Sequence, residues 1–258
     1  MDGAWLFRPA PRPGARARVF CFPHAGGGAS AFRLWPAGLP PEVELCAVQL
    51  PGRENRLREP PFASIRAMVD ALVPALSAHL DRPFALFGHS MGAVLALEVA
   101  RALQARGGPL PGHLLVSSRR PPHLPDPDPP LHVLSDPEFV AEVRRRYGGM
   151  PAEVVRDRDL LTLLLPALRA DVRALETHRP PARPPLPLPI SVFGGSEDRH
   201  APREQLEAWR GETSGAFRVR VFPGGHFYLD ARRAELLADL AATLAPMASG
   251  ARPREATA

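Results

Sequence analysis

Six short apolar runs, separated by helical stretches, constrain the fold of this chain more than any other feature of its sequence. Each run is short and bounded by glycine or proline, and we interpret each as continuously rather than alternately apolar. This pattern is typical of strands in a parallel sheet that is covered on both faces. Because strands alternate with helices, we predict an α/β fold with helices on both faces of a mostly parallel central sheet. The expected strands are Arg18–Phe22, Val43–Leu50, Phe84–Phe87, His113–Ser117, Ile190–Phe193 and Phe217–Phe222.

Helix signals lie between these runs. One helix should begin at a capping serine and bend at Pro74, because proline interrupts the helical hydrogen bonds. Another should end at Gly107-Gly108, a common helix-terminating signal. A third begins with a first-turn proline, and the last is rich in alanine. The expected helices are Ser64–Leu80, Met91–Arg106, Pro202–Arg210 and Ala231–Leu244.

A stretch of about 70 residues between the strands ending near Ser118 and starting near Ile190 carries no strand signal. It begins and ends in proline-rich segments, and two or three helices are expected within it. A capping serine, a first-turn proline and a first-turn acid coincide at Ser135-Asp136-Pro137-Glu138. The stretch 159–178 is a second, leucine-rich helix signal. Insertions this long are usually functional. We therefore predict a single α/β domain over residues 1–258, with a helical lid at about 119–180. The alternative is a small subdomain with a packing role only, which does not act as a lid.

The pentapeptide Gly88-His89-Ser90-Met91-Gly92 lies between an expected strand and an expected helix. This is the G-x-S-x-G pattern in the strand–turn–helix context of a nucleophile elbow. The glycines flank a turn too tight for side chains on its inner side, so the serine should project from the sheet on a strained backbone. The N-terminus of the following helix favours negative charge that develops beside it. Ser90 is therefore the predicted nucleophile, and an ordinary strand–helix turn is the weaker alternative.

A serine hydroxyl needs a base to become a good nucleophile, and the base needs an acid to orient it. After such an elbow the chain order is serine, acid, histidine. Asp198 follows a late strand and is the predicted acid, with its neighbour Glu197 as the competing choice. His226 follows Gly224-Gly225 in the last loop before the final helix and is the predicted base.

The glycine-rich loop 22–28 follows the first clear strand and can direct backbone N–H groups toward the nucleophile. An oxyanion hole would combine the N–H groups of Met91 and Ala25. A phosphate-binding loop is the competing interpretation, but neither of its glycine patterns is present. We expect His89 to pack inside the elbow and His200 to line the acid loop. No histidine or cysteine spacing indicates a metal site.

Composition narrows the classes of partner. The net charge is +5 and all 32 basic residues are arginine, which indicates either an acidic partner or a G+C-rich genome. Arginines are scattered except for Arg144-Arg145-Arg146, so nucleic-acid binding is not expected. No apolar run reaches the roughly 18–20 residues that cross a bilayer. Without a signal-peptide pattern, a cytoplasmic protein with no membrane contact is expected. Cys21 and Cys46 should be reduced core residues.

Five motifs along the chain resemble those of the type II thioesterases, stand-alone α/β-hydrolases that work beside nonribosomal peptide and polyketide synthases. They span nearly the whole chain in the order found in that family. One of them, Pro51-Gly52-Arg53-Glu54, has no mechanism that the sequence explains, and only the resemblance marks it as characteristic. The motifs are Phe22-Pro23-His24-Ala25-Gly26-Gly27, Leu50-Pro51-Gly52-Arg53-Glu54, Phe87-Gly88-His89-Ser90-Met91-Gly92, Phe193-Gly194-Gly195-Ser196-Glu197-Asp198 and Gly224-Gly225-His226-Phe227.

The resemblance implies hydrolysis of acyl thioesters carried on the phosphopantetheine arm of acyl or peptidyl carrier proteins, with small acyl thioesters as simpler substrates. It implies an editing role, the removal of aberrant or stalled acyl groups, and no cofactor. The family's triad corresponds to Ser90, Asp198 and His226. Its oxyanion donors correspond to the N–H groups of Met91 and Ala25.

Three other functions fit the same residues. A carboxylesterase or lipase would use the same triad on an oxyester. An acyltransferase or cyclase would replace water with an alcohol or amine. A carrier-protein binding module would not use the triad at all. Acyl-chain preference, the pathway served, the oligomeric state and the roles of Arg53 and of the arginine cluster stay open at this level.

Overall fold

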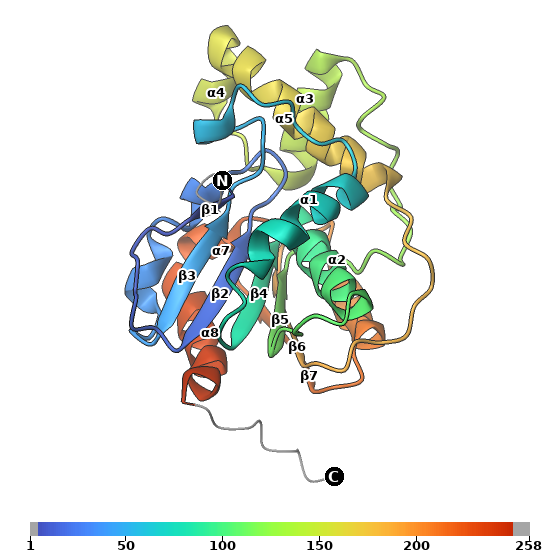
Figure 1. The fold of residues 1–258 in the computed structure, drawn as a ribbon. Helices are drawn as coiled ribbons and strands as arrows, with labels where there is room; N and C mark the ends of the chain where they lie inside the picture. The colour runs from blue at the N-terminus through green and yellow to red at the C-terminus, as the bar shows by residue number, and fades with distance from the viewer. Residues whose placement is uncertain (1–4, 250–258) are drawn as a thin grey trace.

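The strands assemble into one seven-stranded sheet within residues 5–249, the part of the chain that the computed structural model describes. The sheet order is β1-β3-β2-β4-β5-β6-β7, and every neighbouring pair is parallel except β1 with β3 (Figure 1). The predicted α/β fold with a mostly parallel sheet is therefore confirmed. Both ends of the predicted domain, residues 1–258, lie outside the described residues. The strands are β1 Leu6–Phe7, β2 Ala17–Phe22, β3 Val43–Val48, β4 Phe84–His89, β5 His113–Ser117, β6 Ile190–Gly195 and β7 Phe217–Phe222.

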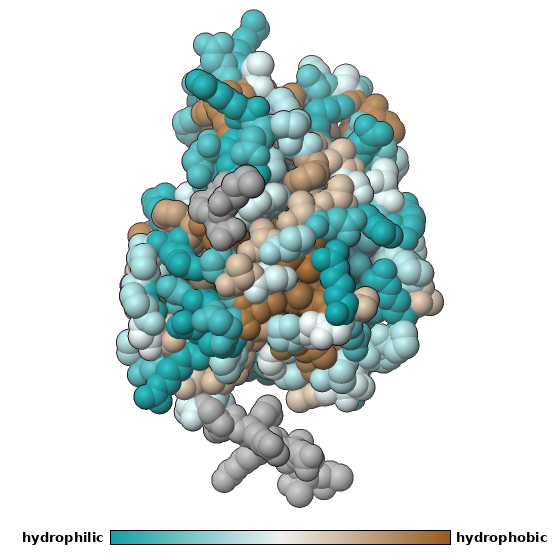
Figure 2. Space-filling model, in the orientation of Figure 1, coloured by the Kyte–Doolittle hydropathy of each residue, from teal (hydrophilic) through white to brown (hydrophobic). Residues whose placement is uncertain are grey.

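Helices cover both faces of this sheet. Along β2, Phe20 packs in a buried cluster with α1 and α2, and its neighbour Cys21 packs in a second cluster with α8. Cys46 belongs to the first cluster. Both cysteines are buried free thiols, as expected. In Figure 2 the visible face is largely hydrophilic, with apolar residues gathered near α1 and α2. The α-helices are α1 Ile65–Ser77, α2 Met91–Ala105, α3 Asp136–Tyr147, α4 Ala152–Arg156, α5 Arg158–Thr177, α6 Arg203–Glu207, α7 Tyr228–Ala231 and α8 Arg233–Ala248.

Several elements differ from the prediction. The expected helix at 202–210 is two elements, because α6 ends at Glu207 and a 3₁₀ helix follows over Ala208–Glu212. The expected last helix, Ala231–Leu244, is present as α8, which starts at Arg233, and the short helix α7 precedes it. Ser64 lies at the cap position of α1, but its side chain makes no capping hydrogen bond. The two-residue strand β1 was missed because so short an edge strand carries no sequence pattern.

Strand β7 was predicted to be buried on both faces, and this is wrong. Its side chains alternate between exposed and partly buried along most of its length, with Arg218 and Arg220 exposed. The reason is its position: β7 pairs only with β6 and forms the edge of the sheet. An edge strand with one face open to solvent keeps the alternation that fully covered strands lose.

The segment between β5 and β6 contains α3, α4 and α5, which lie together at the top of Figure 1. The predicted cap is present: Ser135 and Glu138 form a capping box at the start of α3. Helices α3 and α5 bury a hydrophobic cluster of their own, which includes Phe139 and Leu168. The helical insertion is thus observed, and its action as a lid remains a prediction. Among the helices of residues 5–249, none has the length and apolar character that a membrane span requires.

Candidate active site

Ser90 lies in a strained turn between β4 and α2. Its backbone has φ 55° and ψ −115°, a conformation that non-glycine residues rarely adopt. A Cβ atom added to Gly88 would lie 2.0 Å from the carbonyl oxygen of Gly92. A Cβ atom added to Gly92 would lie 2.0 Å from the carbonyl oxygen of Phe22. Gly88 is therefore required by the turn itself, as the elbow motif predicts, whereas Gly92 is required by the close approach of β2.

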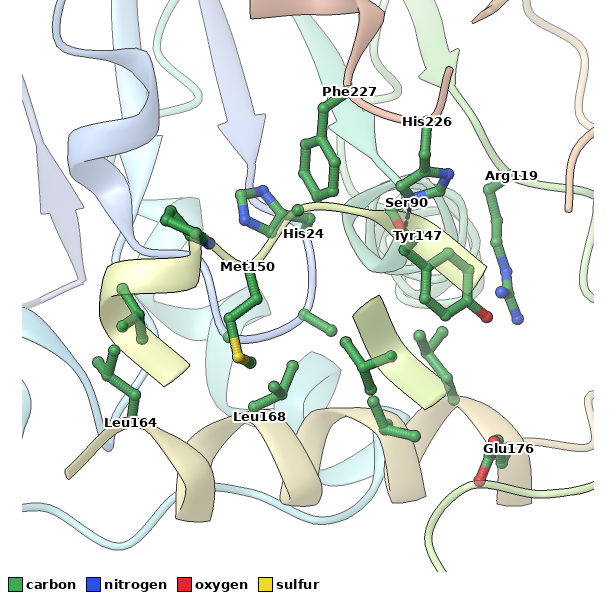
Figure 3. Close-up of a pocket in the computed structure, with 18 of the residues that line it drawn as sticks. His24, Ser90, Arg119, Tyr147, Met150, Leu164, Leu168, Glu176, His226 and Phe227 are labelled. Carbon is green, nitrogen blue, oxygen red and sulfur yellow. Dashed lines mark hydrogen bonds between the residues drawn. The ribbon is translucent and has the colours of Figure 1, made fainter. Parts of the chain in front are cut away.

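The three predicted triad residues come together at the carboxyl ends of β4, β6 and β7. His226 Nε2 lies 3.0 Å from Ser90 Oγ, and His226 Nδ1 lies 2.8 Å from Asp198 Oδ2. Figure 3 shows the histidine directly beside the serine. An ionised carboxylate can only accept, so the Nδ1–H group donates to Asp198 and leaves Nε2 free to accept the serine proton. All three side chains are buried. This arrangement can carry out nucleophilic catalysis with a general base.

Burial separates the two candidate acids. Asp198 is 4% exposed, whereas Glu197 is an exposed residue. Burial alone would raise the pKa of Asp198, but the hydrogen bond from His226 and the nearby charge hold that pKa below its ordinary value. The backbone N–H of His200 also donates to Asp198 Oδ1 at 3.1 Å. Asp198 is therefore ionised at neutral pH and placed to orient the base.

Two further imidazole rings, those of His89 and His24, lie near the base His226. The ring centroid of His89 lies 5.2 Å from that of His226, and His24 lies 6.0 Å from His89. Burial, together with the nearby charge of His226, lowers the pKa of His24 to about 4. The same two causes hold the pKa of His89 well below its ordinary value. Both rings are therefore neutral at neutral pH. His89 is buried inside the elbow, as expected, and its Nδ1 bonds to Ser117 Oγ.

A neutral, partly buried His24 makes the folded state sensitive to acid. In the unfolded chain its pKa returns to 6.5, so protons bind the unfolded state first as the pH falls from 6.5 toward 4. The unfolding free energy therefore has its full value with respect to His24 above pH 6.5, and it decreases as the pH falls toward 4. Between pH 7 and 5, the unfolding free energy should decrease more in the wild type than in His24→Asn, by on the order of 1–2 kcal/mol. Urea unfolding at both pH values measures this, and equal decreases would contradict it.

A cavity of about 190 Å³ lies above the triad, far larger than the roughly 10–15 Å³ that one water needs. Helices α3 and α5 of the insertion form much of its wall. In Figure 3, Met150, Leu164 and Leu168 gather at one end, and Arg119 and Glu176 lie at the other. The cavity, which Ser90 also lines, thus has an apolar end and a polar end. Its residues include His24, Ala25, Ser90, Arg119, Tyr147, Met150, Leu164, Leu168, Glu176, His226 and Phe227.

Several residues of this site carried no sequence signal. Tyr147 ends α3, yet its ring lies 5.0 Å from the ring of His226. The ring of Phe227 packs edge-on against His24 with centroids 4.9 Å apart. His200, expected along the acid loop, stacks near Tyr147 and bonds to Asp128. Only the packing of the insertion onto the sheet brings the ring of Tyr147 against those of His226 and His200.

The two predicted oxyanion donors belong to two different segments next to the cavity that Ser90 lines. Met91 is the first residue of α2, and Ala25 lines the cavity from the glycine-rich loop. Within residues 5–249 neither backbone N–H group donates to another protein group. Two free N–H groups beside a serine are what an oxyanion hole requires. Their role stays a prediction.

Comparison with protein families and curated proteins gives consistent matches. A family model described as a thioesterase domain matches residues 17–244. The gramicidin S biosynthesis protein GrsT of Aneurinibacillus migulanus is 38% identical over 233 residues, which cover 90% of this chain and 91% of that protein. The thioesterase PikA5 of Streptomyces venezuelae is 42% identical over 242 residues, which cover 93% and 85%.

Solved structures match over similar lengths. The RedJ thioesterase from the prodiginine pathway of Streptomyces coelicolor has a TM-score of 0.84 and 43% identity, and the match covers 90% of this chain and 94% of RedJ. The type II thioesterase BorB from the borrelidin biosynthetic cluster has a TM-score of 0.86 and 39% identity, with 95% and 99% covered. The fold of this chain therefore agrees with the folds of these thioesterases.

Proposed function

Because the chain belongs to the thioesterase family, we propose that it releases acyl groups from the phosphopantetheine arm of carrier proteins. The proposed role is editing, the removal of aberrant or stalled acyl groups in nonribosomal peptide or polyketide biosynthesis. The alignment of Ser90, His226 and Asp198 beneath a partly apolar cavity carries this proposal. GrsT belongs to gramicidin S biosynthesis and BorB to the borrelidin cluster, which supports the biosynthetic setting. A cytoplasmic location remains part of the proposal.

The proposed reaction has two halves. His226 accepts the proton of Ser90, whose oxygen attacks the thioester carbonyl. The N–H groups of Met91 and Ala25 stabilise the tetrahedral oxyanion. The C–S bond then breaks, the pantetheine thiol leaves with the proton from His226, and an acyl-serine remains. Water, deprotonated by His226, attacks the acyl-serine and releases the free acid and the serine hydroxyl.

The cavity suggests how the substrate lies. An acyl chain fits against the apolar end, near Met150 and Leu168, because burying apolar surface is favourable. The pantetheine arm then approaches from the polar end, beside Arg119. The insertion helices would set the accepted chain length, since α5 supplies the apolar wall.

One experiment tests the proposal against its alternatives. The same acyl group is offered on a carrier protein, on a small thiol and on an alcohol, and the products are identified by mass spectrometry. We expect free acid, released fastest from the carrier protein. A faster oxyester would indicate a carboxylesterase or lipase, and an ester, amide or ring product would indicate an acyltransferase or cyclase. Binding of the carrier protein without turnover would indicate a binding module.

The structure narrows the expected role of the arginine cluster. Arg145 and Arg146 both bond to Glu142, and Arg146, whose side chain is 6% exposed, also donates to the carbonyl of Pro129. Arg144 is exposed. Arg146 therefore supports the insertion itself. Arg144 and Arg145, whose side chain is 64% exposed, are open to contact with an acidic carrier protein.

We predict that Arg144→Gln lowers kcat/KM for an acyl carrier protein about two- to fivefold, the effect of one exposed charge contact. Hydrolysis of the small-thiol ester should be nearly unchanged. The difference should shrink with added salt, because exposed charges are screened within about 8–10 Å. Arg146→Gln is the matched comparison and should lower both rates. Equal losses on both substrates for Arg144→Gln would contradict docking at this residue.

A further inference from the structure

The motif Pro51-Gly52-Arg53-Glu54 contributes one half of a buried ion pair. Arg53 Nη1 lies 2.6 Å from Asp171 Oδ2, and Arg53 Nη2 lies 3.0 Å from Asp171 Oδ1. The side chains are 3% and 0% exposed. Arg53 follows β3, whereas Asp171 lies on α5 of the insertion, 118 residues further along the chain. A two-point pair of this kind fixes both distance and orientation.

This ion pair also holds the glycine-rich loop. The backbone N–H of Gly26 donates to Asp171 Oδ2 at 2.7 Å, and Arg53 Nη1 donates to the carbonyl of Gly27 at 3.1 Å. The pair therefore binds the loop at the peptide that follows Ala25 and again at the peptide that follows Gly27. Gly26 has φ 74°, and a Cβ atom there would lie 3.1 Å from a methyl group of Leu168 on α5. The insertion helix thus packs directly against this loop.

Other side chains hold the far end of the loop. Gln49 Oε1 accepts a hydrogen bond from the N–H of Ala29 at 2.8 Å. Glu54 Oε1 accepts from the hydroxyl of Ser30 at 2.5 Å. The strand-end segment 49–54 is therefore a cradle for the loop, and the part nearest Ala25 is held by the Arg53–Asp171 pair. A buried pair of this kind is weak evidence for a role in stability alone, because the free energy needed to remove two charges from water offsets much of their attraction.

We propose that Arg53 and Asp171 are positioning residues, which aim the N–H of Ala25 at the oxyanion that forms on the substrate. Asp171 belongs to α5, so the oxyanion hole is complete only while the insertion helix lies against the loop. Arg53 and Asp171 act through the loop and do not touch the reacting atoms. The proposal rests on the proposed function, in which Ala25 is an oxyanion donor, and it explains a motif that the sequence left without a mechanism.

The test removes the pair without leaving a buried charge unpaired. Asp171→Asn or Arg53→Gln alone would leave one partner charged and buried, which is strongly destabilising. In the double variant Arg53→Met/Asp171→Leu, both charges are replaced by apolar side chains, which buried sites often tolerate. With a small-thiol ester, we expect kcat to fall about 10- to 100-fold, because a misplaced donor loses much of its value. KM should change less than about threefold, since the acyl wall is unchanged.

A boronic acid bearing the substrate's alkyl chain gives the decisive measurement. Ser90 Oγ adds to boron and its proton passes to His226, so one boron hydroxyl occupies the oxyanion hole. The double variant should lose boronate affinity about as much as it loses kcat. Its affinity for an unreactive thioether of the same chain should stay within threefold. Equal losses of boronate and thioether affinity would overturn the proposal, because a purely structural role moves both.

A matched control is the buried pair of Arg18 and Glu44, 2.9 Å apart at the start of β2 and near the start of β3, the opposite end of the strands. Arg18→Met/Glu44→Leu should leave kcat and boronate affinity unchanged, whatever it does to the melting temperature. If this variant loses boronate affinity to the same extent, the positioning role is refuted. These assays contain no carrier protein. Failure to accept carrier proteins would refute the proposed substrate alone, and the boronate result would still decide the role of Arg53 and Asp171.

Discussion

Replacing Ser90 with alanine is expected to reduce thioester hydrolysis by about 10⁴-fold or more, while the protein stays folded. The serine oxygen lies 3.0 Å from His226 Nε2, and both residues line the cavity. Without it, no acyl-enzyme forms, and only the oxyanion hole and substrate binding remain to accelerate hydrolysis. Turnover of a small-thiol ester, measured beside the melting temperature, tests this.

The same variant has a direct chemical control. A fluorophosphonate should label the wild type at Ser90 and should not label Ser90→Ala. Alanine at this position carries the same positive φ as the serine, so the backbone strain is retained and loss of turnover reports the missing hydroxyl. Near-normal turnover by a folded Ser90→Ala protein would end the triad assignment.

Asp198→Asn is expected to reduce kcat by about 10⁴-fold, with little change in the fold. The amide would present a donor to His226 Nδ1, or accept more weakly, and would favour the tautomer that cannot accept the serine proton. The carboxylate is buried and hydrogen-bonded to His226 at 2.8 Å, so nothing nearby replaces it. Steady-state kinetics of the purified variant, compared with its circular dichroism spectrum, provide the measurement.

Glu197→Gln is the matched control for the acid. It makes the same chemical change one residue away, on a side chain that is exposed. Its backbone N–H donates to the carbonyl of Gly224 at 2.8 Å, and the substitution leaves that bond intact. Little change in kcat is expected. If Glu197→Gln were the more damaging of the two, the wrong carboxylate would have been chosen.

The parts of this site that could be predicted from the sequence are those with local causes. Although Gly92 is required by its distant neighbour Phe22, Gly88 is required by its contact with Gly92 within one tight turn, so the elbow is visible in five consecutive residues. The capping box of α3 lies within four residues for the same reason. The order of strands and helices follows from short-range patterns of apolar residues. From these, the α/β fold and the resemblance to type II thioesterases followed, and both are confirmed.

Tertiary structure decided what depends on distant neighbours. Asp198 and Glu197 are adjacent carboxylates in one loop, and only the tertiary structure buries the first beside His226 and exposes the second. Strand β7 alternates because it lies at the sheet edge, a position set by strand order. The Arg53–Asp171 pair joins residues 118 positions apart. No local pattern encodes such a contact, because a side chain's burial and charge partners are fixed by what the whole fold places beside it.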